Sequence, residues 1–410
     1  MSDERYLSRR DFLRTTGLVG TSSLLGAGKA LAQGSGEVGG QSPEPKSTTV
    51  PMRPFGKTGV EVSCLSLGGM FDIPSNQLLL KQALRWGVTY WDTADCYEGG
   101  NSELGIGQFL GKYPEVRKQL FLVSKSDARD PSGMTRLLNQ SLERMKTDVV
   151  DLYFVHGISG IKELNQETKA WAEKAKAAGK IKYFGFSTHS NMEDCLQGAA
   201  KLGWLDGIMM TYNFRLMHSD RMKSAIDACA KAGIGLTAMK TQGGGSVSME
   251  SETELQLAGR FLKRGFSDKQ AKLKAVWENR DIASICSQMP TLTILMANIA
   301  AALDQTRLSA ADLELFRQYA CETASSYCAG CASICESVFA GTPPSIREVM
   351  RALMYFHDYG EKEQARVLFA KLPEETRHQL RSGNFTAAER RCPQSLPIGR
   401  LMQEAVSLLA

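Results

Sequence analysis

The feature that most constrains the fold is an alternation of apolar runs with amphipathic stretches, which repeats from Met52 to about residue 300. The runs are short and bounded by polar loops, as buried strands are. Between them, stretches such as residues 76–87 carry leucines on one stripe, as a helix packed on a sheet does. Eight apolar runs are expected to be strands, at residues 60–69, 88–95, 120–125, 149–157, 181–190, 206–214, 233–242 and 291–297.

Alternation of strand and helix over roughly 250 residues favours a closed parallel (β/α)8 barrel over an open doubly wound sheet. An open sheet that binds a dinucleotide would carry G-x-G-x-x-G after its first strand, and no such motif follows the first apolar run. The expected fold class is therefore α/β, with a TIM barrel over residues 51–310. Residues 311–410 change to helical patterns alone and are expected to form a small all-α domain.

Three amphipathic stripes predict helices in this C-terminal part. Ser345 and Glu348 have the spacing of a capping box, and an apolar stripe follows them to residue 354. Two further stripes lie at residues 365–372 and 401–409. Each stripe is short and flanked by charges, so we expect core packing and no stable membrane span.

Polar residues stand where a barrel of this kind places its chemistry. Asp92, Lys125 and His156 are 33 and 31 residues apart, about one β/α unit each, and each ends or directly follows an apolar run. Tyr97 comes five residues after Asp92 in the next loop. Because the carboxyl ends of parallel strands share one face of a barrel, these four side chains are expected to converge at one mouth.

These residue types can perform proton transfer at a carbonyl. A lysine beside Tyr97 stabilises the phenolate and lowers a phenol pKa that starts near about 10, which makes Tyr97 a candidate general acid. Asp92 would hold Lys125 charged and in place, and His156 would donate to a substrate oxygen. The alternative is four unrelated residues: a salt bridge, a surface histidine and a loop tyrosine.

Six segments carry a resemblance to a known family: "MRPFGKTGVEVSCLSLGG", "YWDTADCYEGGNSELGIGQFL", "LFLVSK", "DLYFVHGI", "KIKYFGFSTHS" and "GIGLTAMK". Together they resemble the aldo-keto reductases, (β/α)8 barrels that reduce carbonyls with NADPH. The resemblance covers about residues 50 to 310. It implies that Tyr97 is the proton donor, that Lys125 and Asp92 tune it, and that His156 orients the carbonyl.

The cofactor positions depart from the family pattern. Where the family carries Ser-Asn against the nicotinamide amide, this chain has Ser187 and Thr188, which are the candidate cofactor-binding residues. The family's Gln and ring-stacking Tyr fall near residues 209–210 and 239–240, which differ. Residues 281–306 contain no Lys or Arg to hold a 2'-phosphate. NADP(H) is therefore expected to bind poorly.

A run of cysteines predicts a metal centre in the C-terminal part. Cys328, Cys331 and Cys335 lie at C-x2-C-x3-C spacing, and Cys392 is followed by Pro, the form of the remote ligand in bacterial iron–sulfur runs. These four are the candidate ligands of one [4Fe–4S] cluster, with Cys321 as the spare candidate for the fourth. Some aldo-keto reductase relatives carry a ferredoxin-like C-terminal extension, which this part resembles. A zinc site or disulfides are the alternatives.

The N-terminus is typical of an export signal. Arg9 and Arg10 precede a mildly apolar run, and Ala30 and Ala32 form a small-x-small cleavage step. Residues 1–32 resemble a twin-arginine signal peptide, whose pathway carries folded proteins, and residues 33–50 read as a flexible Gly/Ser/Pro-rich linker. A protein that receives a cluster in the cytoplasm must cross the membrane folded, so a periplasmic location is expected.

Two classes of function remain open. The formal charge of +5 is spread along the chain without a Lys/Arg block, which gives no reason to expect nucleic acid as a partner. The first class is an exported oxidoreductase that acts on a small carbonyl or alcohol, with the cluster exchanging electrons with it or with a redox partner protein. The second is a non-catalytic barrel that binds a ligand or partner and carries a structural cluster.

Overall fold

The structure, a computed structural model, describes residues 49–244 and 252–410. The expected signal peptide, and the linker up to residue 48, lie outside the described residues. The described residues belong to one compact unit. Across these ranges no helix combines the length and the apolar character that crossing a membrane needs.

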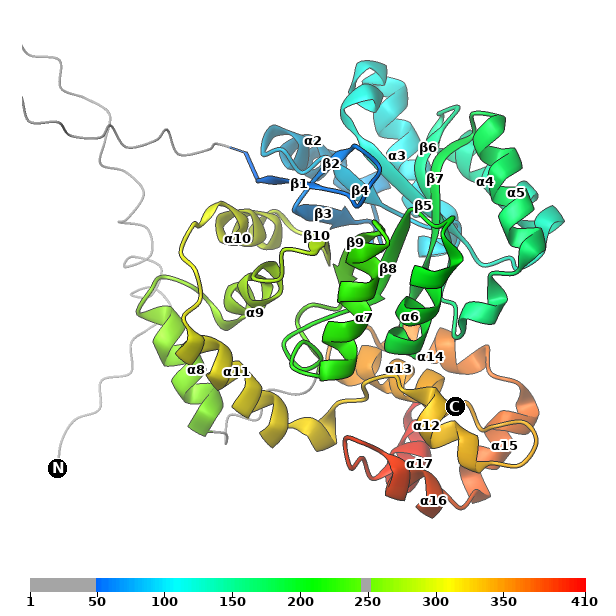
Figure 1. The fold of residues 1–410 in the computed structure, drawn as a ribbon, viewed down its shortest axis with the longest axis vertical. Coiled ribbons are helices and arrows are strands. Elements are labelled where there is room, and N and C mark those ends of the chain that lie inside the picture. The colour runs from blue at the N-terminus through cyan, green and yellow to red at the C-terminus, as the bar shows by residue number, and fades with distance from the viewer. Residues whose placement is uncertain (1–48, 245–251) are drawn as a thin grey trace, which may run out of the picture. The chain divides into compact units, whose positions relative to one another are not determined.

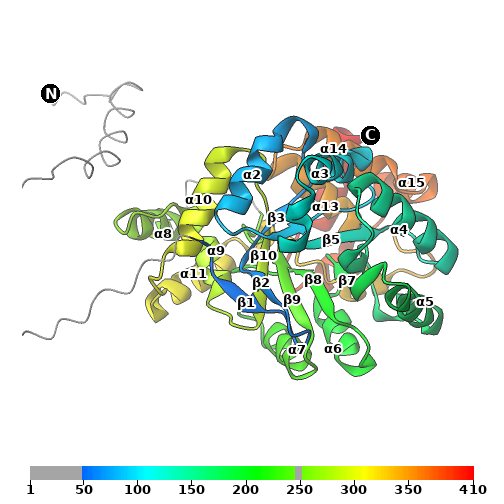
Figure 2. The same cartoon turned by 90° about the horizontal axis from the view of Figure 1, so that it is seen from above.

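Parallel strands form a closed barrel, which confirms the expected fold class. In the described residues eight strands close in the order β10-β3-β4-β5-β6-β7-β8-β9, and Figure 2 shows them surrounded by helices. The apolar runs form these strands because both faces of a barrel strand are buried. The barrel strands are β3 (Leu65–Gly68), β4 (Tyr90–Asp92), β5 (Phe121–Ser126), β6 (Val150–Val155), β7 (Ile181–Thr188), β8 (Gly207–Thr211), β9 (Gly235–Met239) and β10 (Ile282–Gln288).

The eighth strand lies elsewhere than predicted. Residues 291–297 are not a strand but begin the helix α10, because the Thr291 hydroxyl accepts a hydrogen bond from Ile294 N and caps that helix. The strand is instead formed by Ile282–Gln288, which pairs with β3 and β9 and closes the barrel. The apolar, β-branched start of α10 resembles a buried strand, and periodicity alone does not separate the two over so short a run.

Helices cover the outside of the barrel between successive strands (Figure 1). Except for α8 (Glu252–Leu262), whose Leu257 and Phe261 pack in a separate apolar cluster, their inner faces pack on the outward side chains of the strands in the largest apolar cluster of the described residues. These helices are α2 (Gln77–Arg85), α3 (Asn101–Lys112), α4 (Pro131–Met145), α5 (Gln166–Ala177), α6 (Met192–Leu202), α7 (Asp220–Lys231), α8 (Glu252–Leu262), α9 (Asp268–Trp277) and α10 (Leu292–Leu303).

A short antiparallel hairpin, β1 (Met52–Pro54) with β2 (Glu61–Ser63), supplies the plug at the amino ends of the strands. Phe55, which follows β1, is fully buried, and its ring centroid lies 5.4 Å from that of Phe121. It belongs to the apolar cluster that fills the barrel interior. This end is therefore closed by packing, which leaves the carboxyl ends of the strands for chemistry.

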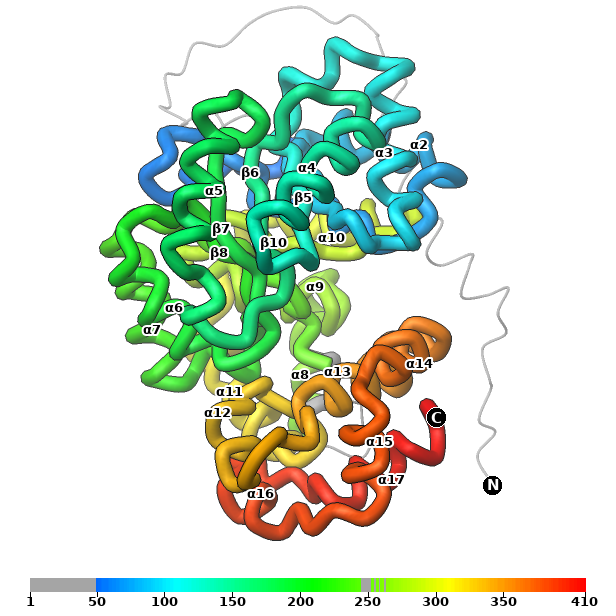
Figure 3. The backbone as a smooth tube through the Cα atoms, turned by 90° about the vertical axis from the view of Figure 1, so that its right-hand side faces the viewer, coloured from blue at the N-terminus to red at the C-terminus, as the bar shows by residue number. Residues whose placement is uncertain are grey.

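The C-terminal part is all-helical, as expected. From residue 346 onward its helices share an apolar cluster of their own, and Figures 1 and 3 show them gathered together in orange and red. The helices are α11 (Ala310–Glu322), α12 (Ala332–Cys335), α13 (Ile346–His357), α14 (Lys362–Ala370), α15 (Glu374–Ser382), α16 (Thr386–Arg391) and α17 (Ile398–Leu409). The division of the chain at residue 310 remains a prediction.

The expected capping box at Ser345 is absent. Ser345 adopts a left-handed conformation with φ of 51°, and its side chain makes no capping hydrogen bond. The Glu348 carboxylate does not return to the helix N-terminus and instead lies near Arg347 and Arg351. Ser345 and Glu348 thus have the sequence spacing of a capping box but do not form its hydrogen bonds.

Asp312 anchors α11 to α8 through a buried ion pair. Its side chain is fully buried and contacts Arg260 and Arg264, the latter at 2.8 Å. Burial alone would raise its pKa, but hydrogen bonds, first from Ser309 and then from the two arginines, lower the pKa of Asp312 to about 2. Because the folded pKa lies below the unfolded value, this stabilisation is present above about pH 4 and is lost as the pH falls toward 2.

We therefore expect Asp312→Asn to lower the free energy of unfolding at pH 7 by about 1–3 kcal/mol, since the arginines lose a charged partner. The difference from wild type should shrink below about pH 4. Denaturant titrations at neutral and acidic pH measure both effects. Asp220→Asn is the matched control, because the Asp220 side chain is 99% exposed. An equal loss in both variants would contradict the assignment.

Candidate active site at the barrel mouth and the cysteine loop beside it

Lys125, near the end of β5, is a buried ammonium whose three protons have three acceptors. Its Nζ lies 2.7 Å from Asp92 Oδ2, 2.7 Å from the Thr93 carbonyl oxygen and 3.1 Å from Tyr97 Oη. Burial is the largest single effect and opposes its charge, but the Asp92 carboxylate, together with Tyr97 and Cys286, outweighs burial and raises the pKa of Lys125. The side chain is therefore held charged and aimed at the phenol.

Tyr97 begins a short 3-10 turn after β4 and points its hydroxyl at Lys125. Since Tyr97 Oη accepts from the ammonium, its own O–H proton remains available to a substrate oxygen. Burial raises the pKa of Tyr97 by more than Lys125 lowers it. The sequence predicted that the pKa of Tyr97 is lowered toward neutrality, but in the structure it is raised. The phenol therefore stays protonated.

His156 follows β6 and closes the group of four. Its ring lies edge-on to that of Tyr97, with centroids 5.7 Å apart. Its Nδ1 lies 2.8 Å from Asp127 Oδ1, so Nε2 is the ring nitrogen left for a substrate. Burial lowers the pKa of His156 by more than the hydrogen bond to Asp127 raises it.

The structure brings Asp92, Tyr97, Lys125 and His156 together at the carboxyl ends of β4, β5 and β6. The parallel register explains this convergence, because Asp92 pairs with Val123 and Lys125 pairs with Phe154 on neighbouring strands. The arrangement offers one protonated acid, a fixed cation behind it and an imidazole beside it. Such a set can protonate or deprotonate an oxygen bound at the mouth.

The sequence model of the Aldo/keto reductase family matches residues 66–306, more than half of the chain. The chain belongs to the aldo/keto reductase family. The match begins in β3 and continues beyond α10, so it covers the whole barrel.

Curated aldo/keto reductases match parts of this chain. "Aldo-keto reductase yakc [NADP(+)]" of Schizosaccharomyces pombe is 32% identical over 157 residues, which are 34% of this chain and 46% of that protein. "Uncharacterized oxidoreductase YqkF" of Bacillus subtilis is 32% identical over 151 residues, 33% of this chain and 48% of that protein. The chain thus spans about half the length of these relatives.

Solved aldo-keto reductases share the fold. An enzyme of Bacillus halodurans in its holo form superposes with a TM-score of 0.55 at 20% identity, covering 66% of this chain and 96% of that one. The thermostable aldo-keto reductase Tm1743, in complex with epalrestat, gives 0.55 at 24% identity, covering 65% and 99%. In both cases about a third of this chain lies outside the superposition.

Ser187 and Thr188, the candidate cofactor residues, end β7 as buried side chains. Ser187 Oγ accepts from Gly157 N at 2.9 Å, and Thr188 Oγ1 contacts the Ile158 carbonyl oxygen at 2.8 Å. Both hydroxyls are thus engaged by the loop that follows β6. Their role toward a cofactor stays a prediction.

The first turn of α10, which follows β10, exposes apolar side chains. Leu292 and Ile294, in the first turn of α10, are 54% and 41% exposed. Neither side chain can form an ion pair with a phosphate. Residues 281–306, which contain no Lys or Arg, comprise β10, the following loop and all of α10. These elements thus offer no cationic side chain to a phosphate.

The four candidate cluster cysteines lie close together. Cys328, Cys335 and Cys392 all pack against the apolar cluster of the C-terminal helices, and Arg391, next to Cys392, donates to Ser337 Oγ at 3.3 Å, just after the cysteine run. Burial, with a contribution from the neighbouring thiols, raises the pKa of Cys328 and Cys335 to about 12. All ten cysteines lie in the described residues, and each is a free thiol there. Four converging thiols of this kind fit the ligand set of an iron–sulfur cluster.

Cys321, the spare candidate, lies on α11 as an exposed residue. Its thiol interacts with Arg317, one turn earlier on the same helix. This position favours Cys392 over Cys321 as the fourth member of the cysteine set.

The cysteine loop, residues 328–335, is docked on the barrel mouth. The Gly330 carbonyl oxygen accepts from Asn191 N at 2.8 Å, and Asn191 Oδ1 accepts from Ser333 N at 2.8 Å. Gly330 has a φ of 76°, and a Cβ on it would lie 2.4 Å from the His189 carbonyl oxygen. Glycine alone tolerates both that conformation and that approach.

A second contact joins α13 to the end of β9. Lys240 Nζ donates to Tyr355 Oη at 3.1 Å and lies 4.3 Å from the centre of that ring. A cavity of about 500 Å³ lies beside this contact, with His189, Thr211, Lys240 and Cys328 among its lining residues. The cavity therefore lies between the ends of β7, β8 and β9 and the cysteine loop, and Asp92, Tyr97, Lys125 and His156 are not among its lining residues.

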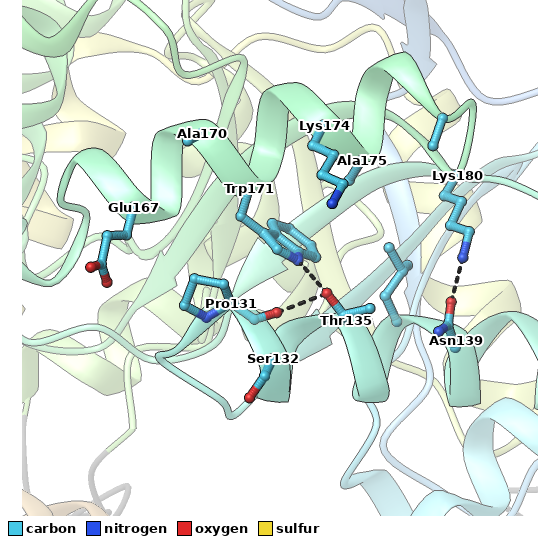
Figure 4. Close-up of a pocket in the computed structure, with 12 residues that line it drawn as sticks. Pro131, Ser132, Thr135, Asn139, Glu167, Ala170, Trp171, Lys174, Ala175 and Lys180 are labelled. Atoms are coloured by element: carbon cyan, nitrogen blue, oxygen red, sulfur yellow. Dashed lines mark hydrogen bonds between the residues drawn. The ribbon is translucent and has the colours of Figure 1, made fainter.

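Another hollow lies away from the strand ends. Figure 4 shows it between α4 and α5 on the outside of the barrel, with a volume of about 670 Å³. Trp171 donates to Thr135 across it, and Lys180 donates to Asn139. None of the four mouth residues lines it, so we assign it no part in the chemistry.

Sequence reasoning missed several residues of the mouth. Asp127 and Tyr355 were not singled out, although one contacts His156 and the other contacts Lys240. Asp127 could have been found as a polar residue directly after β5. Tyr355 gave no signal, because it lies 115 residues from its partner.

Proposed function

We propose that this aldo/keto reductase is an oxidoreductase that interconverts a small carbonyl and the corresponding alcohol at the barrel mouth. The observation that carries the proposal is the buried chain of hydrogen bonds from Asp92 through Lys125 to Tyr97. It holds one phenol with its proton free toward the mouth. A panel of aldehydes and ketones, assayed with an electron donor as described in the Discussion, tests the proposal.

In the reductive direction, a hydride equivalent, which is two electrons and one proton, adds to the carbonyl carbon. Tyr97 Oη gives its proton to the carbonyl oxygen as the C–O double bond becomes single. The Lys125 ammonium, already in contact with Oη, stabilises the phenolate that remains. Asp92 keeps Lys125 in that position, and the ring of His156 lies beside that of Tyr97, where it would border the same substrate oxygen.

The cysteine set is proposed to hold one [4Fe–4S] cluster. Cys328, Cys331, Cys335 and Cys392 are its ligands, which the mutual proximity of the four thiols supports. Such a cluster supplies or accepts single electrons when bound. Carbonyl reduction takes two electrons together, so a two-electron carrier is also required. A redox partner protein is the proposed source or destination of the electrons.

Export by the twin-arginine pathway, and hence a periplasmic location, is part of the proposal. It rests on Arg9 and Arg10 and on the Ala30 to Ala32 cleavage step. A protein that folds around a cluster in the cytoplasm can be exported only by a pathway that carries folded proteins. A fusion of residues 1–32 to a reporter that is active only after export checks this proposal independently of the barrel.

NADPH is expected to bind weakly and no better than NADH. Residues 281–306 offer no cation for the 2'-phosphate that distinguishes the two, although one relative is named for NADP(+). Calorimetric titration of the anaerobic, cluster-loaded protein with each nucleotide measures the difference. Micromolar affinity for NADPH, or affinity at least about 10-fold tighter than for NADH, would contradict the expectation.

A further inference from the structure

Four side chains with metal-binding donors meet at the outer rim of the barrel mouth. Asp95 and Cys96 follow β4, Asp127 follows β5 and His156 follows β6. One donor atom from each lies within 4.8 Å of the donor atoms of the other three. Three different strand ends therefore supply one cluster, which is distinct from the cysteine loop.

The distances within this rim cluster are close to those of a coordination sphere. Cys96 Sγ lies 3.7 Å from His156 Nδ1, and Asp127 Oδ1 lies 2.8 Å from the same nitrogen. A tetrahedral ion with bonds of about 2.0–2.3 Å separates its ligands by about 3.3–3.8 Å. The thiol and the imidazole are already at that separation, and Asp127 needs to move by about 0.5–1 Å, which an exposed side chain can do.

Asp95 provides an independent sign of a missing partner. Its side chain is buried, with the residue only 9% exposed, and its Oδ1 has no hydrogen-bond partner within the described residues. An unpartnered oxygen on a buried carboxylate is costly, and such atoms in native proteins call for an explanation. A cation bound by the rim cluster would supply a partner for Oδ1, in addition to the hydrogen bonds that the carboxylate makes with Cys96 and with the backbone of Asp127.

We propose that Asp95, Cys96, Asp127 and His156 bind a divalent transition-metal ion of the zinc type. One thiolate, one imidazole and two carboxylates are a donor set for such an ion, whereas magnesium and calcium prefer oxygen ligands alone. The four donors of the rim cluster need no contribution from the cysteine loop.

The ion would also settle which nitrogen of His156 carries the proton. A metal bound at Nδ1 takes the place of the proton there, so the ring keeps its proton on Nε2. Nε2–H can then donate to a substrate oxygen. This consequence rests on the proposed function, but the metal site itself does not.

Zinc binding to the full chain, prepared without oxygen and loaded with its iron, tests the site without any turnover assay. We expect one zinc per chain, and zinc-edge X-ray absorption with about one sulfur and three nitrogen or oxygen ligands. Cys96→Ser and Asp127→Asn should each weaken zinc binding about 10-fold or more in competition with a chromophoric chelator. The visible spectrum of each variant checks that the fold and the iron content persist.

The matched controls are Cys321→Ser and Asp130→Asn. Cys321 is exposed on α11, and Asp130 caps α4, a position that asparagine also caps well. Both controls should bind zinc as the wild type does. A zinc ion with four sulfur ligands, no zinc uptake at micromolar concentration, or unchanged affinity in both Cys96→Ser and Asp127→Asn would overturn the proposal.

Discussion

Replacing Tyr97 by Phe should reduce carbonyl turnover by about 100-fold or more while the fold and the iron content persist. The change removes the phenolic oxygen. This oxygen accepts a hydrogen bond from Lys125 Nζ at 3.1 Å and offers its own proton to the substrate. Little volume is lost, so packing around the mouth should survive. Steady-state rates on any carbonyl compound that the wild type reduces measure the effect.

Tyr113→Phe is the matched control for that variant. Tyr113 lies outside the mouth, where its ring packs against Phe109, and its loss of an oxygen should leave turnover unchanged. Lys125→Met should act in the same direction as Tyr97→Phe, because the phenolate loses its cation. Full activity in the Tyr97→Phe protein would exclude Tyr97 as the general acid, whereas a wild type that turns over no carbonyl would favour a non-catalytic, ligand-binding barrel.

Replacing Cys392 by Ser should abolish the iron–sulfur cluster. Anaerobic wild-type protein is expected to carry about four irons and four sulfides per chain, and the variant close to none, because one of four thiolate ligands is lost. Iron and sulfide analysis, together with the visible absorption, measures the change.

Cys321→Ser is the control for the cluster, since Cys321 is exposed on α11. It should keep its iron in full. The reverse result, with iron lost from Cys321→Ser and kept in Cys392→Ser, would reassign the fourth ligand. One zinc and no iron at the cysteine set, or paired disulfides there, would exclude the cluster.

Most of the barrel could be predicted from the sequence, because each buried strand is a short apolar run that ends in polar residues. The exception is instructive. Residues 291–297 and residues 282–288 are both apolar, and only the cap formed by Thr291 and the pairing of β10 with β3 separate helix from strand. The cap is local, but the pairing of β10 with β3 joins residues more than 200 positions apart and leaves no local pattern.

The candidate site was predictable to the same extent. Asp92, Lys125 and His156 recur once per β/α unit, so topology alone brings them together. Contacts made by the C-terminal helices, such as Lys240 with Tyr355, depend on how those helices dock and have no periodic signature. The tuning of Tyr97 also escaped prediction, because burial at that position outweighs the neighbouring charge.

The most direct test of the account is whether carbonyl compounds consume electrons through this protein. A reduced one-electron viologen dye and a free flavin, which serves as the two-electron carrier, are mixed without oxygen with the cluster-loaded protein and a panel of aldehydes and ketones, and oxidation of the dye is followed by absorbance. The account expects at least one carbonyl to be reduced with two dye molecules consumed per carbonyl, and the reaction to be lost in both Tyr97→Phe and Cys392→Ser. Dye oxidation that is independent of carbonyl, or that persists in either variant, would contradict it.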